Sequence, residues 1–333
     1  MKPLFDKKFF SLYLSILSFV FIASCAMQLS SQTKPLNKKE AKGVSVSNRD
    51  FPRLPVLAED SSFPLVSAQA ALVVDWDSMV TLYEKNPDAS LLPASTTKIV
   101  TALVAMDYYP DDVILEVGRV NVEGQKMGLR QGEKISAGNL LLGLLVYSAN
   151  DAAEVLAQNY CAPGSLGEVG FCGRDSFVIA MNQKARDLNL ENSFFANPTG
   201  LDGNGDRITS TAKDLVRVSM VAMEIRRFAD IVKTKEITVA SVDGKISHKL
   251  YNINELVGQV DGVLGVKTGW TENARENLVT YIERDGHKII IALLGSQDRF
   301  GETKELINWI FGSYKWEEVN PRNSPELRPG YKP

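Results

Sequence analysis

The order of the apolar runs constrains the fold of this chain more than any other feature of its sequence. Strand-like runs stand at both ends of the patterned region, at residues 70–74 and 80–82 and again at 278–282 and 289–293. Segments with apolar residues at helical spacing fill the middle. Strands that flank a helical middle favour an α+β fold with a mostly antiparallel sheet.

The same patterns give the expected elements. Helices are predicted at 95–109, 136–145, 151–159, 176–188, 210–228 (with Ser210 as its N-terminal cap) and 302–311. Further strands are predicted at 237–239 and 263–266. Hairpin turns are expected at residues 75–78 and at Gly286.

The N-terminal region has the layout of an export signal. Three lysines precede an apolar run at 9–23, and small residues come directly after it. Residues 22–25 also resemble the lipobox of bacterial lipoproteins, so Cys25 is a candidate lipidation site. An uncleaved anchor is the alternative, because an apolar stretch of about 19 residues nearly spans a bilayer. We expect residues 1–25 to be a signal or anchor, and the domain to act in the periplasm or at the cell surface, with membrane contact only through its N-terminus.

The rest of the chain divides into three parts. Residues 26–62 are polar and lack apolar periodicity, which is typical of a flexible tether. Residues 63–315 contain the predicted helices and strands and are expected to form one folded domain. Residues 316–333 are polar and proline-containing, and we expect them to be a disordered tail.

Composition excludes two classes of function. The chain has 37 Lys and Arg against 40 Asp and Glu, without a basic cluster, so it is a poor candidate for nucleic-acid binding. Its two histidines and three cysteines cannot assemble a zinc motif, so no metal site is expected. A hydrolase built on this chain therefore needs a base other than histidine, and His248 and His287 should be replaceable without loss of the chemical step.

Two of the cysteines flank a loop rich in glycine and proline. In an exported chain Cys161 and Cys172 could close a disulfide, worth roughly 2–4 kcal/mol of stability. Two unpaired thiols are the alternative.

A lysine can replace histidine as the base when burial lowers its pKa. The pattern Ser-x-x-Lys on a helix puts both side chains on one face. It occurs as Ser31/Lys34, Ser95/Lys98 and Ser210/Lys213. The first lies in the expected tether, and the serine of the third is explained as a helix cap. Only Ser95 and Lys98 open a helix whose next residues are apolar, so only this pair places a lysine against a core.

Two further patterns are weak when taken singly. Ser148-Ala149-Asn150 interrupts two predicted helices and could offer a hydroxyl and an amide to a cleft. Lys267-Thr268-Gly269 ends an apolar run, where Gly269 would let a ligand approach the backbone closely. Each is also explained as an ordinary loop or strand end.

Together, in the order SxxK, SxN and KTG, the three patterns resemble the signature set of penicillin-binding proteins and serine β-lactamases. The segments PASTTK, SANDAAEVLA, NPTGLD and VDGVLGVKTGWT are similar, within that superfamily, to the low-molecular-mass D-Ala-D-Ala carboxypeptidases, which trim peptidoglycan stem peptides. The resemblance covers about residues 65–313. It implies a penicillin-binding-protein fold, with a cleft between an antiparallel sheet and an all-helical part, and no cofactor.

The resemblance also implies roles for the motif residues. Ser95 would be the nucleophile and Lys98 the general base. Ser148 would relay a proton to the departing D-alanine, and Asn150 would position the substrate amide or Lys98. Lys267 would help keep Lys98 neutral and attract the substrate carboxylate.

The remaining roles belong to the predicted strand of the third motif and to the residues after it. Thr268 would hydrogen-bond the substrate carboxylate, beside Gly269. The backbone N–H groups of Ser95 and Trp270 would form the oxyanion hole. Arg299 is the candidate arginine for the carboxylate. Arg275 stands where the family commonly has glycine, which leaves the conformation of that turn open.

The implied activity is a penicillin-sensitive serine D-Ala-D-Ala carboxypeptidase, acylated on Ser95 by peptidoglycan stem peptides and by β-lactam antibiotics. A D,D-endopeptidase is the alternative, because the sequence after the last helix is too short for the C-terminal domain and amphipathic anchor of many relatives. A β-lactamase is disfavoured because SAN replaces SDN and no matching glutamate-bearing loop is found. An inactive wall-binding homologue is disfavoured because every motif side chain is present.

Overall fold

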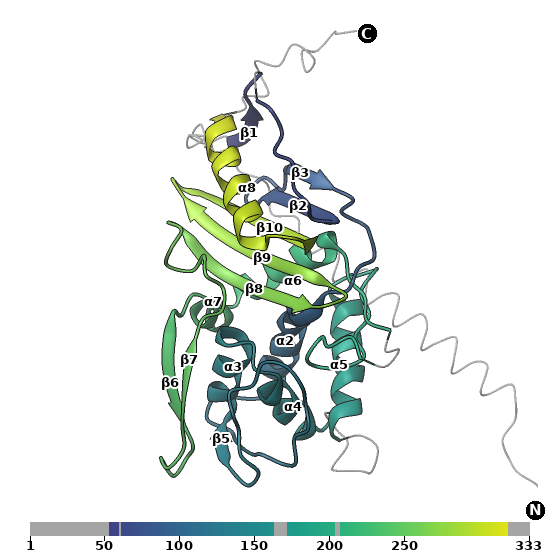
Figure 1. The fold of residues 1–333 in the computed structure, drawn as a ribbon, viewed down its shortest axis with the longest axis vertical. Coiled ribbons are helices and arrows are strands. Elements are labelled where there is room, and N and C mark those ends of the chain that lie inside the picture. Colours follow the sequence, from purple (N-terminus) through teal and green to yellow (C-terminus); the bar gives the residue numbers. More distant parts are fainter. Residues whose placement is uncertain (1–52, 60, 163–171, 204–206, 319–333) are drawn as a thin grey trace, which may run out of the picture. The chain divides into compact units, whose positions relative to one another are not determined.

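A five-stranded antiparallel sheet lies at the centre of the protein, in the strand order β3-β2-β10-β9-β8 (Figure 1). The computed structural model describes residues 53–59, 61–162, 172–203 and 207–318. The five strands are β2 (Ala70–Asp75), β3 (Thr81–Lys85), β8 (Val263–Thr271), β9 (Arg275–Arg284) and β10 (His287–Ser296). Strands from both ends of the sequence thus share one sheet, and the predicted α+β class is confirmed.

Strand β10 shows why the sheet needs cover on both faces. Successive side chains of a strand point to opposite faces. Ile290, Ala292 and Leu294 belong to the larger hydrophobic core, together with the helices of the middle region. Their neighbours Ile289, Ile291 and Leu293 pack in a second core with α8 (Arg299–Ser313), which covers the other face (Figure 1).

The larger core joins the sheet to the helices of the middle region. These are the 3-10 helix η1 (Ala94–Thr97) and the helices α2 (Lys98–Tyr108), α3 (Ala137–Val146), α4 (Asn150–Gln158), α5 (Arg174–Asp187), α6 (Ala212–Glu224) and α7 (Arg226–Val232). The first eight residues of α2, from Lys98 to Ala105, are all buried. A helix that is buried all round lies inside a core, so α2 holds its N-terminal lysine there.

The middle region is not purely helical. It carries two additional two-stranded antiparallel sheets, β4 (Ile114–Glu116) with β5 (Lys134–Ser136) and β6 (Glu236–Ala240) with β7 (Ser247–Tyr251). The strand predicted at 237–239 therefore exists but lies outside the central sheet. Only Val239 of β6 is fully buried, whereas the central strands bury runs of consecutive residues.

The folded domain extends beyond both of the boundaries predicted for it, residues 63 and 315. Strand β1 (Arg53–Leu57) pairs with β11 (Tyr314–Glu318), so residues assigned to the tether and the tail form a sheet. Neither five-residue segment gave a signal of its own, because the pairing joins opposite ends of the described chain. Tyr314 OH donates to Leu82 O at 2.7 Å and Trp316 Nε1 to Asp75 Oδ2 at 2.9 Å, which ties this sheet to β2 and β3. The signal region and Cys25 lie outside the described residues.

One predicted helix differs at its start and in its length. The N-terminal cap is Thr211, whose side chain accepts from Asp214 N, and not Ser210. Ser210 instead exchanges backbone hydrogen bonds with Leu91. The predicted helix 210–228 is also divided at Ile225 into α6 and α7.

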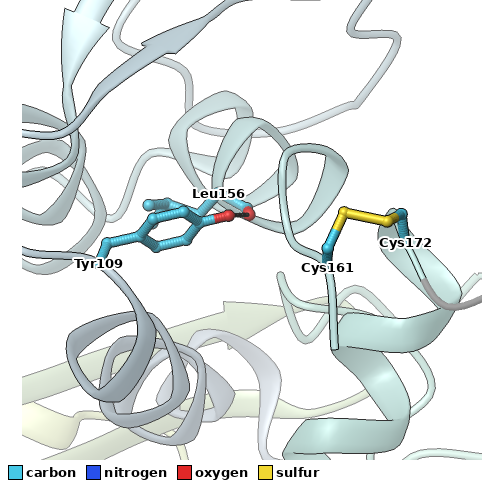
Figure 2. Close-up of a disulfide and its surroundings, with 4 residues drawn as sticks. All are labelled: Tyr109, Leu156, Cys161 and Cys172. Atoms are coloured by element: carbon cyan, nitrogen blue, oxygen red, sulfur yellow. Dashed lines mark hydrogen bonds between the residues drawn. A yellow bond between two sulfur atoms is a disulfide. The ribbon is translucent and has the colours of Figure 1, made fainter. Parts of the chain in front are cut away.

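A disulfide joins Cys161 to Cys172, with an S–S distance of 2.01 Å. Figure 2 shows the bond next to the end of α4, where Tyr109 OH donates to Leu156 O at 3.0 Å. The structure thus has the pairing and not two free thiols. In the described ranges, no helix is both long and apolar enough to cross a membrane.

Candidate active site

Ser95 and Lys98 lie at the junction of η1 and α2, where the chain enters the larger core. Lys98 Nζ donates to Ser95 Oγ at 2.9 Å and to Thr199 O at 2.7 Å. The lysine side chain is 0% exposed. The spacing of three residues brings the ammonium nitrogen onto the serine oxygen, as the sequence predicted.

The environment of Lys98 suits a general base. Burial lowers its pKa from 10.5 to about 7, against the opposing charges of Glu154 and Asp151, which raise it. Near neutral pH a large fraction of the amine is therefore unprotonated and able to take a proton.

Lys267 and Ser148 form a second buried pair. Lys267 Nζ donates to Ser148 Oγ at 2.8 Å and to Thr268 O at 2.9 Å. Burial lowers the pKa of Lys267 well below its usual value, and the charges of Lys98 and Arg299 lower it further. The structure thus brings two lysines and two serines from the three sequence motifs to one place.

The backbone is unusual at both serines. Ala94, which precedes Ser95, has φ 48°, and Ser148 has φ 61°. Residues other than glycine rarely adopt this left-handed conformation, which costs about 1–3 kcal/mol and persists where the surrounding structure enforces it. The two serines are therefore presented by sharp turns, one entering η1 and one between α3 and α4.

Gly269 allows strand β8, at the edge of the sheet, to approach η1. A Cβ atom at this position would lie 2.9 Å from Pro93 O and 3.1 Å from Ser95 N. Trp270 is the next residue, with a side chain that is 62% exposed. The amides of Ser95 and Trp270 thus lie on two backbone segments that approach each other closely.

Asn150 and Arg299 border this arrangement. Asn150 Nδ2 donates to Glu123 O at 2.7 Å, whereas its buried Oδ1 has no hydrogen-bond partner among the described residues. Arg299 begins α8, and its Nη1 donates to Gly269 O at 3.1 Å. Asn150 thus has an unpaired acceptor two residues after Ser148, and the charge of Arg299 acts on Lys267.

Arg275 lies at the turn that follows strand β8, and its backbone conformation was left open by the sequence. Arg275 has φ 58°, so it adopts the conformation for which glycine is common at this place.

Segment 197–200 contributes to the site although no role was predicted for it. Asn197 Oδ1 accepts from Thr199 N, Thr199 Oγ1 and Gly200 N, which directs the carbonyl of Thr199 to Lys98. A Cβ at Gly200 would lie 1.9 Å from Ala94 O. The NPTGLD segment was the available signal, but only the tertiary contact reveals its partner.

The other Ser-x-x-Lys pairs are not part of this site. Lys213 pairs with Asp88 at the surface, at 3.1 Å, and Ser210 Oγ lies 2.9 Å from Ser193 Oγ. Ser31 and Lys34 lie outside the described residues.

Known proteins are similar to this chain in sequence and in fold. A family model described as D-alanyl-D-alanine carboxypeptidase matches residues 58–298. The carboxypeptidase DacB2 of Mycobacterium tuberculosis is 33% identical over 77% of this chain and 84% of its own length. A D-alanyl-D-alanine endopeptidase of Pseudomonas aeruginosa is 32% identical over 85% of this chain and 87% of its own. The crystal structure of the Streptomyces K15 DD-transpeptidase superposes with a TM-score of 0.69 at 30% identity, covering 75% of this chain and 99% of that one.

Proposed function

Because this chain belongs to the D-alanyl-D-alanine carboxypeptidase family, we propose that it removes the terminal D-alanine of peptidoglycan stem peptides through an acyl-enzyme on Ser95. The family membership confirms the resemblance found in the sequence. The protein is therefore a serine-type carboxypeptidase, a hydrolase that acts on cell-wall peptides outside the cytoplasm.

In the acylation step, Ser95 Oγ attacks the carbonyl carbon of the penultimate D-alanine. Neutral Lys98 takes the hydroxyl proton, for which its 2.9 Å contact with Ser95 Oγ provides the path. The C–N bond then breaks, and the proton taken up by Lys98 passes through Ser148, which contacts Lys267 Nζ, to the leaving amine, so that Lys98 is neutral again. D-alanine leaves, and Ser95 carries the remaining peptide as an ester.

Charge stabilisation is assigned to the strand edge. The N–H groups of Ser95 and Trp270 would bind the oxyanion. This assignment is supported by Gly269, whose missing side chain lets strand β8 approach η1 closely. Lys267, Thr268 and Arg299 would hold the terminal carboxylate of the substrate. Water, activated by Lys98, would then hydrolyse the ester and free the enzyme.

One observation carries this proposal: a fully buried lysine, with its pKa lowered to about 7, contacts the hydroxyl of a serine at the start of a core helix. The test is release of D-alanine from a pentapeptide ending in D-Ala-D-Ala. Wild type should release it, and Ser95→Ala should not. Ser210→Ala is the matched control, because Ser210 also precedes a lysine by three residues.

Acylation by penicillin is a second test of Ser95 as the nucleophile. We expect intact-mass spectra to show one penicilloyl adduct on wild type and on Ser210→Ala, and none on Ser95→Ala. An adduct that persists on Ser95→Ala would refute the assignment.

A D,D-endopeptidase is the second candidate, favoured by the Pseudomonas relative, which matches over most of both chains. The same acyl-enzyme would then form on cross-linked stems. Comparing kcat/KM for a pentapeptide with that for a cross-linked dimer separates the two activities. Faster cleavage of the dimer would replace the first proposal with this one.

We also propose that residues 1–25 direct export and that Cys25 is lipidated, which would tether the domain to the membrane through residues 26–52. Labelling of cells with a palmitate analogue should mark wild type and not Cys25→Ser. Labelling of both proteins, or of neither, would contradict lipidation at Cys25.

A further inference from the structure

The direction of the Asn150 amide is set by the neighbouring segment 123–130. Asn150 N donates to Gln125 O at 2.7 Å, and Asn150 Nδ2 donates to Glu123 O at 2.7 Å. A carbonyl oxygen can only accept, so the NH₂ group must face Glu123. The buried Oδ1 is left as an acceptor with no partner among the described residues.

Asp151, the next residue, holds the second half of this segment. Its Oδ1 accepts from Met127 N at 3.0 Å, and its Oδ2 accepts from Gly128 N at 2.9 Å and Leu129 N at 3.0 Å. The carboxylate is buried, with the residue 3% exposed. Three consecutive backbone amides of the segment therefore depend on one side chain of α4.

A buried His248–Glu133 pair holds the same segment from the other side. His248 Nδ1 lies 3.0 Å from Met127 O, and Nε2 lies 2.7 Å from Glu133 Oε1. Because the carbonyl only accepts, Nδ1 must carry a hydrogen. Glu133 Oε2 also accepts from Arg130 N at 3.1 Å. We call Asp151, Glu133 and His248 the clamp.

Side-chain packing holds little of segment 123–130. Residues 123–126 are exposed, and Met127 is its one fully buried residue. An exposed segment with few apolar contacts opens at low free energy unless polar contacts fix it. The conformation of this segment, and with it the position of the Glu123 carbonyl, therefore depends on the clamp.

We propose that Asp151 and His248 are positioning residues of the enzyme. By fixing segment 123–130 they hold the Asn150 amide so that its Oδ1 accepts a hydrogen bond from an N–H group of the peptide substrate. This inference rests on the proposed function for its substrate and on the clamp geometry for its mechanism.

The first test is Asp151→Asn, which keeps the size of the side chain. In either orientation of the new amide, an NH₂ group faces backbone N–H groups that need an acceptor. We expect KM for D-alanine release to rise about tenfold, the value of one hydrogen bond to substrate, with kcat within about threefold of wild type.

Asp214→Asn is the matched control. Asp214 is also a buried carboxylate in the first turn of a helix, and it accepts from Asn192 N at 2.9 Å and Ser193 Oγ at 2.8 Å. Loss of these contacts should lower stability and leave KM unchanged. An equal rise of KM in both variants would mean that general loosening is responsible, and would overturn the proposal.

A double-mutant cycle tests whether Asp151 acts through Asn150. In an Asn150→Ala background, Asp151→Asn should change KM by less than about twofold, because the amide that it positions is absent. Full additivity of the two effects would overturn the proposal.

His248 and His287 provide a second, independent pair of variants. His248→Gln should raise KM about threefold through the lost contact with Met127 O, one ordinary hydrogen bond. His287 begins β10, and its ring stacks on Trp316 with ring centroids 3.9 Å apart, so His287→Gln should leave KM unchanged. Unchanged KM in both variants would remove His248 from the proposal.

A structural readout separates failure of the clamp from failure of the proposed function. Trypsin should cleave after the exposed Lys126 at least about tenfold faster in Asp151→Asn than in wild type or Asp214→Asn, because the segment opens more often. If wild type releases no D-alanine but this difference holds, the function is wrong and the clamp stands. Equal cleavage rates in all three proteins would refute the clamp.

Discussion

Two groups of buried charge lie close to each other in this protein, and they are built in opposite ways. In the catalytic group, Lys98 and Lys267 donate only to hydroxyl and carbonyl oxygens, and within the described residues neither has an ion-pair partner. In the clamp, the carboxylate of Asp151 accepts from backbone N–H groups, and Glu133 accepts from Arg130 N and lies 2.7 Å from His248 Nε2. Burial without an ion-pair partner lowers the pKa of an amine, whereas burial with matched hydrogen-bond partners fixes a structure.

The largest expected effect removes the unpaired base. Lys98→Met keeps the volume of the side chain and should lower kcat/KM for D-alanine release about 10³- to 10⁴-fold, because the proton of Ser95 loses its acceptor. The change should lie almost entirely in the acylation rate with penicillin, measured by stopped flow. Retention of more than about a tenth of the activity would mean that another group is the base.

The second expected effect concerns stability, and here the two groups should behave in opposite ways. Folding lowers the pKa of Lys98 from 10.5 to about 7, so keeping its charge buried destabilises the fold fully below pH 7, and less as the pH rises towards 10.5. Lys98→Met should therefore raise the free energy of unfolding by about 3–5 kcal/mol at pH 6, and by roughly half of that at pH 9.

Asp151→Ala is the counterpart within the clamp. It leaves backbone N–H groups without their acceptor and should destabilise the protein by about 2–3 kcal/mol. Urea unfolding at pH 6 and pH 9 measures both variants. A destabilised Lys98→Met protein would end the distinction between the two groups.

The close approach of strand β8 to η1 belongs to the catalytic group alone. Gly269→Ala puts a Cβ 2.9 Å from Pro93 O and should lower kcat/KM about 100-fold by displacing the oxyanion site. Trp270→Ala keeps the backbone N–H and removes an exposed side chain, so we expect a change below about threefold. The steady-state kinetics of the two variants test the assignment, and the reverse order of effects would assign the role to the indole.

The smallest effect is the pH dependence of wild type. With the pKa of Lys98 at about 7, the neutral fraction grows about tenfold between pH 6 and pH 8, and the acylation rate should rise with it. Stopped-flow acylation across this range measures the midpoint. A rate that falls as the pH rises would show that the protonated lysine is the active form.

Local patterns predicted much of the fold and the chemical groups of the site. Apolar periodicity located the helix that begins at Lys98 and the hairpin at Gly286, because these signals lie within a few residues of each other. Local patterns did not predict the contacts between residues that lie far apart in the sequence. Strand β1 pairs with β11 from the other end of the described chain, and Ser210 is held by Leu91 while the neighbouring Thr211 caps the helix.

The sequence by itself showed no histidine in a recognisable catalytic context, predicted that Ser95 and Lys98 share one helical face, and contained two further motifs. These conclusions depend on residue types and short spacings. Only the tertiary structure decided that Lys267 contacts Ser148, that Thr199 supplies a carbonyl to Lys98, and that His248, unlike His287, is buried against the segment beside Asn150. The physical reason is that burial and pairing, which separate a reactive charge from a structural one, come from residues far apart in the chain.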